Sequence, residues 1–289
     1  MRTWKTHFAI LIIFVAAAFC GHAFAGTMTD AVAERLVDLE ACIAYLEKTG
    51  NLVRVKSEVN PEYELAGIAK KFEGDKCILF ENVKGSDFPV FMGMLWNRDI
   101  VGNLFNVPKE QIPFTIASGI GPWKKDPSAL AEKVLDRGPA NEVIMKEPDL
   151  YKLPAPIHAL KDGGRYFDSS VVVVRHPETG VPNISIHRLM VTGKDRLTFL
   201  IDPGRHLGAY LEIMEKQNKP LEVTINNGIG LAPWIVSAIP RQGEGKYRIA
   251  HHILGRPIDF IKAQTVDVPA YADAQFVIEA EILPNVREE

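Results

Sequence analysis

Cysteine is scarce in this sequence: 289 residues contain three, and they lie far apart. Cys20, Cys42 and Cys77 form neither a Cys-x-x-Cys pair nor spacings typical of a disulfide framework. We therefore expect reduced, structural thiols. A basic excess is also missing, since the net charge is −3 with 24% of the residues charged. This balance argues against nucleic acid and against an anionic membrane surface as partners.

The common glycine-rich loops and sequence repeats are absent as well. No Gly-x-Gly-x-x-Gly motif opens a helix, no Walker loop occurs, and the chain has no internal repeat. The composition, 47% hydrophobic, is that of a soluble globular protein. Its length suffices for one large domain or two ordinary ones.

The longest apolar run, Phe8 to Phe19, lies at the N-terminus and is too short for a comfortable transmembrane helix. Two basic residues precede it, and Ala23-Phe24-Ala25 has the form of a signal-peptidase site. One interpretation is a signal peptide over residues 1–25 and an exported protein. The alternative is that translation starts at Met28 and the protein is cytoplasmic.

Residues 28–120 are predicted to form a small α/β domain. A first helix begins at Thr29 or Asp30 and ends at Gly50, because apolar residues repeat at helical spacing between them. Three prolines, at 108, 113 and 122, predict irregular chain at the end of this domain. The other expected elements are strands at 52–55, 77–83 and 90–95 and helices at 61–72 and 97–105.

The sequence pattern of residues 121–289 is typical of a β domain. Because this domain follows a small α/β domain, the fold class is predicted to be α+β. Many short strands with tight turns between them favour an antiparallel sheet closed into a barrel. One helix, at about 206–216, interrupts the set. The expected strands are 142–145, 169–174, 183–191, 197–201, 221–225, 258–262 and 276–282.

The segment Asn183-Ile184-Ser185-Ile186-His187-Arg188 carries the polar residues of greatest interest. Period-two alternation places Asn183, Ser185 and His187 on one face of the strand and Arg188 on the other. Each residue taken singly is equally compatible with the solvent face of a half-buried strand.

A second polar cluster, Pro203-Gly204-Arg205-His206, follows the same predicted hairpin. His206 comes directly after a turn and opens a helix, where free backbone N–H groups favour anions. An imidazole and an amide oxygen are also reasonable metal ligands, and such a metal would screen a phosphate. The two clusters together indicate a site for a phosphate, a divalent metal and a carboxylate.

Several blocks in this order resemble the UbiD family of decarboxylases. The resemblance runs from about Met28 to the C-terminus. It rests on Asp162-x-Gly164-x-Tyr166, Pro177-Glu178-Thr179-Gly180, the 183–188 segment, Arg205-His206, Ser237-Ala238-Ile239-Pro240 and Val268-Pro269-Ala270 to Glu279.

The resemblance implies a fold and a chemistry. Residues 121–289 would form a flavin-binding, split β-barrel-like domain. The cofactors would be prenylated FMN, a divalent metal (Mn²⁺) and K⁺, and the reaction a non-oxidative decarboxylation of an aromatic or α,β-unsaturated carboxylic acid. The flavin serves as the electron sink in such reactions. A prenyl-FMN synthase would have to supply it.

The resemblance also implies roles for individual residues. Arg188 matches the arginine that orients the substrate carboxylate, and Glu279 the acid that returns a proton to carbon. The implied metal ligands are Asn183 and His206. The implied cofactor-binding residues are Asn183, Ser185, Ile186, His187, Arg188, Arg205, His206, Ser237, Ala238, Ile239 and Pro240.

The chain departs from the family pattern at two glutamates. Lys246 stands where the family has its third metal ligand, and Glu244 is the substitute we expect if the loop shifts. Gln275 stands where the family commonly has the first glutamate of its catalytic pair, so it keeps hydrogen bonding there but loses the charge.

The third departure is length, because family members continue into a C-terminal domain beyond the position of Glu289. The sequence is therefore interpreted as a fragment or one part of a split gene. We expect either a homo-oligomer or a complex with a chain that supplies the absent domain. A flavin-phosphate-binding remnant without turnover remains the alternative function.

Overall fold

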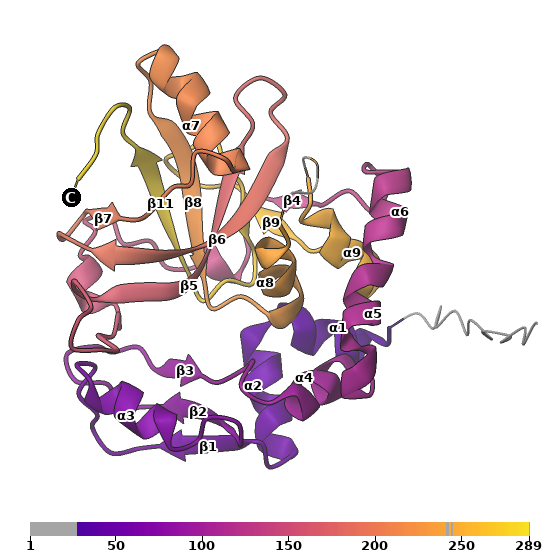
Figure 1. The fold of residues 1–289 in the computed structure, drawn as a ribbon, viewed down its shortest axis with the longest axis vertical. Helices are drawn as coiled ribbons and strands as arrows, with labels where there is room; N and C mark the ends of the chain where they lie inside the picture. The colour runs from indigo at the N-terminus through magenta and orange to yellow at the C-terminus, as the bar shows by residue number, and fades with distance from the viewer. Residues whose placement is uncertain (1–27, 241–242, 244, 289) are drawn as a thin grey trace, which may run out of the picture.

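The computed structural model describes residues 28–240, 243 and 245–288 (Figure 1). Two predictions lie outside these residues: the signal segment 1–25 with its export alternative, and the metal ligand Glu244. In the part of the chain that is described, no helix is long and apolar enough to cross a membrane.

The N-terminal helix is broken in two, α1 (Asp30–Val37) and α2 (Leu39–Lys48), whereas the sequence predicted one helix to Gly50. Asp38 adopts an extended conformation, pairs with Ile229 in a β-bridge, and its carboxylate accepts a hydrogen bond from the Glu40 N–H. A residue that caps one helix cannot continue the preceding one. A contact distant in sequence thus sets the break.

A small three-stranded sheet follows, with strand order β1-β2-β3. Its strands are β1 (Leu52–Val55), β2 (Cys77–Phe80) and β3 (Val90–Met92), and α3 (Glu64–Lys70) connects the parallel pair β1 and β2. This unit has a core of its own around Phe80 and Leu65. The predicted strands and helix are confirmed here: β1 has the predicted bounds, and the other three elements are shorter than predicted.

Three helical elements follow α4 (Arg98–Phe105): η1 (Lys109–Gln111), α5 (Ile112–Ser118) and α6 (Ile120–Lys125). The prediction of irregular chain at the prolines was wrong. Proline is compatible with the first turn of a helix, where the backbone N–H has no intrahelical acceptor. Pro113 occupies such a position at the start of α5.

The connection to the second half contains only short elements: β4 (Val134–Leu135), η2 (Pro139–Asn141) and η3 (Leu150–Lys152). The strand predicted at 142–145 was wrong. Its apolar side chains are exposed, Val143 by 89%, and have no sheet to pack on.

A five-stranded antiparallel sheet dominates the second half, in the order β11-β8-β5-β6-β7 (Figure 1). It curves into a half-barrel with open edges, so the prediction of a closed barrel was wrong: the described part of β11 pairs with β8 alone. The strands are β5 (Tyr166–Arg175), β6 (Pro182–Val191), β7 (Leu197–Thr198), β8 (Leu221–Asn227) and β11 (Phe276–Ile282). A second, small sheet joins β4 to β9 (Phe260–Ile261) and β10 (Ala270–Tyr271).

Helices cover both faces of the large sheet. α7 (His206–Lys216), predicted with these bounds, packs through Leu211 on the face that contains Val172 and Val174. α8 (Leu231–Ala238) packs on the opposite face, and α9 (Arg248–Leu254) lies beside α8. The expectation of a single helix in this half was therefore wrong.

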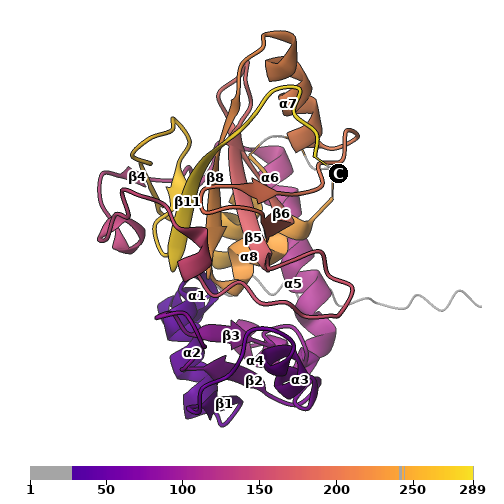
Figure 2. The same ribbon diagram turned by 90° about the vertical axis from the view of Figure 1, so that its left-hand side faces the viewer.

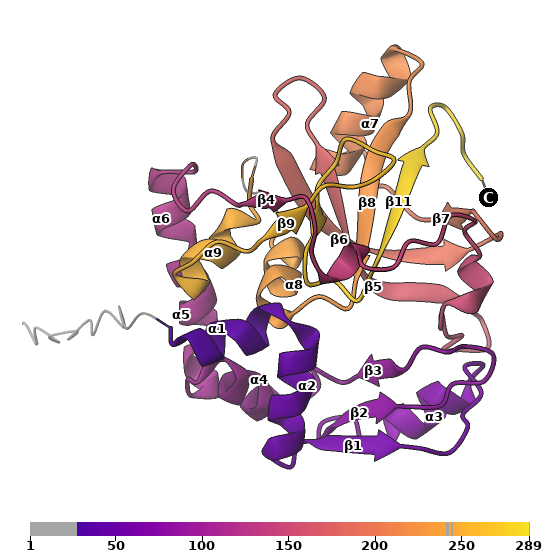
Figure 3. The same ribbon diagram turned by 180° about the vertical axis from the view of Figure 1, so that it is seen from behind.

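The largest core cluster combines residues of the N-terminal helices with residues of the half-barrel. Figure 2 and Figure 3 show from two sides that helix α1 lies next to the half-barrel. Gly230 lies at this junction. Its N–H donates to the Val37 carbonyl over 2.8 Å, and an added Cβ would lie 2.3 Å from that oxygen. The two predicted units therefore share one core, in which helices α1 and α8 pack against each other.

Candidate functional site

A cavity of about 320 Å³ lies along the free edge of β6. Over residues 183–187, β6 pairs with β5, while β7 joins it at Met190 and Val191. The other walls come from the segment before α7 and from the end of α8. The lining residues are Ile184, Ser185, Ile186, His187, Leu200, Asp202, Arg205, His206, Leu207, Ser237, Ala238, Ile239, Pro240 and Lys246.

Nine of the eleven residues predicted to contact a cofactor line this cavity, although they come from three separate segments. The tenth, Asn183, is buried, and its side-chain Nδ2 lies 2.6 Å from Nδ1 of His206, which does line the cavity. The fold thus brings together residues that are up to 57 positions apart, Asn183 to Pro240.

The alternation predicted for β6 is present. Ser185 pairs with Val172, in the core under α7, and Ile184 pairs with Val173, in the core under α8. Because β6 has a free edge here, residues from both of its faces border the cavity.

His187 is held by its neighbours and stays neutral at neutral pH. Its Nε2 lies 2.8 Å from Oγ of Ser185, and its ring packs edge-on against Phe199. Burial lowers the pKa of His187 to about 4, helped by the positive charges of Lys246 and Arg205. His187 therefore offers hydrogen bonds rather than charge to a ligand.

Asn183 and His206 form a compact pair between β6 and α7. The Asn183 Oδ1 accepts a hydrogen bond from the Ile184 N–H over 2.9 Å, which orients the amide. The His206 ring is parallel to the Tyr210 ring, with 6.0 Å between centroids. The two predicted metal ligands are therefore adjacent, with their side chains in contact with each other.

A tight turn presents the start of α7 to the cavity. The Asp202 carboxylate accepts from the Gly204 N–H over 2.9 Å and from Arg205 Nε over 3.1 Å. A Cβ on Gly208 would lie 2.4 Å from the Asp202 carbonyl oxygen, so this position requires glycine. α7 starts without a side-chain cap from Arg205, and the positive end of its dipole faces the cavity.

Lys246 is the buried charge of the cavity. The residue is 6% exposed, and its Nζ donates to the carbonyls of Ser237 and Ile239, each over 2.9 Å. These carbonyls lie at the C-terminal end of α8, where the helix dipole favours a cation. Burial lowers the pKa of Lys246 to about 8, and the charge of Arg205 adds to the effect.

The described residues supply an incomplete ligand set for a divalent metal, because Glu244, the third predicted ligand, lies outside them. No three His, Cys, Asp or Glu side chains gather among them in a way that would hold a metal ion. The position predicted to match a glutamate ligand carries the ammonium of Lys246. A protonated amine cannot ligate a cation and repels one nearby.

Arg188 lies outside the cavity lining, on the face of β6 opposite to His187. Its guanidinium lies over the Tyr166 ring, 4.2 Å from the centroid, and 3.7 Å from the Asp162 carboxylate. The side chain is 59% exposed. It is thus held loosely beside the cavity, with room to engage a carboxylate.

Glu279 and Gln275 belong to β11 and the residues before it, at the other edge of the sheet. Three strand spacings, about 14 Å, separate β11 from β6. The Glu279 carboxylate accepts from the N–H groups of Gln264 and Thr265, over 2.8 and 2.6 Å. Gln275 packs beside Gly228. The structure does not bring these two side chains into the cavity.

Register nevertheless places Glu279 and Arg188 on one face of the sheet. Glu279 pairs with Thr224, which pairs with Val173, which pairs with Ile184. Paired residues share a face, and Arg188 follows Ile184 by an even number of residues in the same strand.

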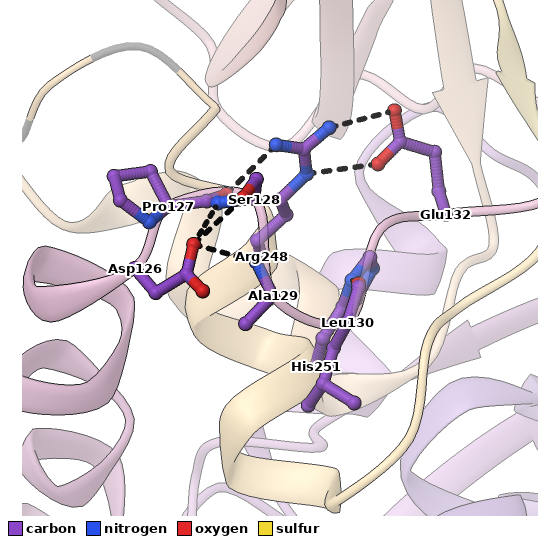
Figure 4. Close-up of polar contacts among 8 residues, drawn as sticks. All are labelled: Asp126, Pro127, Ser128, Ala129, Leu130, Glu132, Arg248 and His251. Atoms are coloured by element: carbon purple, nitrogen blue, oxygen red, sulfur yellow. Dashed lines mark hydrogen bonds and ion pairs between the residues drawn. The ribbon is translucent and has the colours of Figure 1, made fainter.

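A largely buried ion pair that the sequence did not predict has one member, Arg248, close to Lys246 in the chain. Figure 4 shows the Arg248 guanidinium bound twice to the Glu132 carboxylate, over 2.9 and 3.2 Å. Its Nη1 also donates to the Pro127 carbonyl. Burial is the largest single influence and raises the pKa of Glu132, but the hydrogen bonds from Arg248 and Tyr247, a backbone hydrogen bond and the charge of Arg248 together hold that pKa below its ordinary value. Nothing in the local sequence links positions 132 and 248.

A larger hollow of about 590 Å³ lies between residues 136–144 and Gln264. Two of its polar groups have partners: the Asp136 carboxylate lies 2.7 Å from Lys262 Nζ, and the Asn141 side chain accepts from the Gly138 N–H. It collects none of the predicted site residues, so we do not assign the site there.

The chain is thus an α+β protein whose half-barrel has a polar cavity at one sheet edge, with the N-terminus of α7 in the cavity wall. Residues 132–289 match the 3-octaprenyl-4-hydroxybenzoate carboxy-lyase Rift-related domain and residues 43–120 the corresponding N-terminal domain. The chain belongs to the UbiD family.

Individual relatives agree with this assignment. The chain is 42% identical over 255 residues to the "uncharacterized protein in cooM 5′ region" of Rhodospirillum rubrum, covering 86% of this chain and 55% of that protein. It is 34% identical over 232 residues to the anhydromevalonate phosphate decarboxylase of Methanosarcina mazei, covering 78% and 51%.

The fold is similar to an evolved dimeric form of the UbiD-class enzyme HmfF from Pelotomaculum thermopropionicum, solved in complex with prFMN. The TM-score is 0.80 at 37% identity, over 87% of this chain and 58% of that one. The chain spans about half the length of the curated relatives it matches.

Proposed function

We propose that this chain binds prenylated FMN in the cavity along β6 and takes part in the non-oxidative decarboxylation of an aromatic or α,β-unsaturated carboxylic acid. The observation that carries the proposal is the convergence of three segments, at 184–187, 205–206 and 237–240, on one cavity. The UbiD-class HmfF complex with prFMN and the decarboxylase from Methanosarcina mazei support it by similarity.

The residues around the cavity suit a flavin phosphate and its polar chain. Arg205, Lys246 and the N-terminus of α7 would bind the phosphate, because all three are positive. Ser185 and the 237–240 segment would contact the rest of the cofactor. Bound prenylated FMN would supply an electron sink for the charge left on carbon when carbon dioxide departs.

Two residues outside the cavity would act on the substrate. The exposed guanidinium of Arg188 would hold the carboxylate that leaves, a task suited to two parallel N–H donors. Glu279 would return a proton to carbon, which requires that its carboxylate first give up the N–H groups of Gln264 and Thr265.

A second candidate function is flavin binding without turnover by this chain alone. It is favoured by the engagement of the Glu279 carboxylate in three hydrogen bonds and by the neutral Gln275. In that case a partner, either a second copy or a chain that supplies a further domain, would complete the catalytic site.

The experiment is co-expression with a prenyl-FMN synthase, followed by purification, an absorption spectrum and an assay of carbon dioxide release from aromatic and cinnamic-type acids. We expect bound flavin and acid-dependent release. Bound flavin without release would support the second candidate. A folded protein without flavin would exclude both.

A further inference from the structure

Lys246 is a buried, positively charged side chain that lines the cavity. Two of the three N–H groups of its ammonium donate to the carbonyls of Ser237 and Ile239, in the 237–240 segment that lines the cavity. The third N–H has no hydrogen-bond partner among the described residues. The ammonium is therefore anchored, yet it keeps one donor for a ligand.

The charged groups around this ammonium leave the cavity positive. Arg205 is the second cation, and the carboxylate of Asp202 is tied to Arg205 and to the Gly204 N–H. His187 is neutral at neutral pH. No described carboxylate lies within salt-bridge distance of Lys246. An anion is the ligand that such a cavity selects.

We propose that this cavity binds the phosphate of FMN without a divalent metal, and that the Lys246 ammonium is the built-in cation that takes the metal's place. The inference rests on the proposed function, since it specifies how the same site holds its cofactor. The α8 carbonyls partly balance the charge when the cavity is empty, and the phosphate balances it when the cavity is filled.

The test is a fluorescence titration of the purified full chain with unmodified FMN, in EDTA and in Mn²⁺. We expect wild-type affinities within about twofold of each other in the two conditions. Lys246→Met should weaken FMN binding by about 10- to 100-fold, the effect of losing a hydrogen bond to a charged group. Mn²⁺ should not restore it.

Three controls separate this role from a structural one. Riboflavin lacks the phosphate, so its affinity should be the same for wild type and Lys246→Met. Lys246→Arg keeps the charge and should retain most of the FMN affinity. Lys262→Met removes an exposed lysine that pairs with Asp136 outside the cavity and should change nothing.

The outcomes distinguish this proposal from the proposed function. Wild-type binding of FMN that requires Mn²⁺ would overturn the metal-free site while leaving the flavin-binding function intact. The absence of FMN binding in both conditions would overturn the function itself. If Lys246→Met does not fold, the metal dependence of the wild type and the affinity of Lys246→Arg still decide the matter.

Discussion

For Arg188, the sequence predicted the face of the strand but not the contacts of the side chain. Alternation in β6 correctly placed it on the face opposite to His187. Its contacts with Tyr166 and Asp162 were not predictable, because they depend on how the 158–166 segment folds back onto the strand. These contacts leave the guanidinium accessible.

Changing Arg188 to Ala should lower turnover by at least about 100-fold and leave FMN affinity within about twofold, because the guanidinium would contact the substrate and lies outside the cavity. Steady-state carbon dioxide release and an FMN titration measure the two effects. Arg196→Ala is the matched control, since Arg196 is equally exposed and pairs with Glu288. Unchanged turnover in Arg188→Ala would show that another group holds the carboxylate.

The buried residue His251 should make stability depend on pH. Burial lowers its pKa to about 4, and its Nδ1 lies 2.7 Å from the Leu130 carbonyl. The unfolded chain, with a histidine pKa near 6.5, binds more protons between pH 4 and 6.5, so stability falls as pH falls through that window.

We expect the free energy of unfolding to decrease by roughly 3 kcal/mol at most through His251 between pH 7 and pH 4. His187 contributes in the same direction. Urea unfolding at a series of pH values measures the slope. His251→Asn keeps a donor for Leu130 but does not titrate, so its slope should be smaller. An identical slope would mean that other groups cause the dependence.

At the scale of elements, local sequence patterns predicted helix α7 and strand β6, two of the elements that border the cavity. Pro203-Gly204 and the apolar spacing after it indicate the bounds of α7, and alternation indicates β6. Helix α8 was missed because it is short and apolar on most sides, which gives no clear helical period. The segment 237–240, which lines the cavity at the end of α8, was nevertheless singled out through the family resemblance.

The Arg248–Glu132 ion pair joins α9 to the 126–132 segment, and it is an element-scale contact that sequence reasoning cannot supply. Both side chains are mostly buried, with exposures of 17% and 12%. Removing one member of a buried pair leaves the other charge uncompensated, at a cost of about 3–5 kcal/mol.

Glu132→Gln should therefore reduce the free energy of unfolding by about 3 kcal/mol, with a smaller effect on FMN binding. Chemical denaturation followed by circular dichroism gives the value. Asp136→Asn breaks the exposed pair with Lys262, where solvent screens the charges, and should cause a much smaller loss. Equal losses in the two variants would argue against a structural role for the buried pair.

At the scale of the whole molecule, the two predicted units share one apolar core. Val37 of the first unit and Gly230 of the second are in backbone contact, and the helices on either side belong to one apolar cluster. Such contacts join residues almost 200 positions apart and leave no periodic trace in sequence. The N-terminal helices thus stabilise α8, whose end forms a wall of the cavity.

The half-barrel edge is also a property of the whole fold. A closed barrel would have buried the free edge of β6, whereas the open sheet leaves residues 183–187 beside the cavity. The three segments that line it meet because α7 and α8 cover opposite faces of the sheet, and α7 begins and α8 ends near this edge. The site exists through the assembly of these elements rather than through any one motif.

Equilibrium dialysis of the full chain against FMN tests the central claim most directly, because it measures occupancy without requiring turnover. The account predicts saturation at one FMN per chain and a marked loss of affinity when Arg205 and Lys246 are both changed to Met. Circular dichroism would verify that both proteins are folded. The absence of saturable FMN binding to folded wild-type protein would contradict the account.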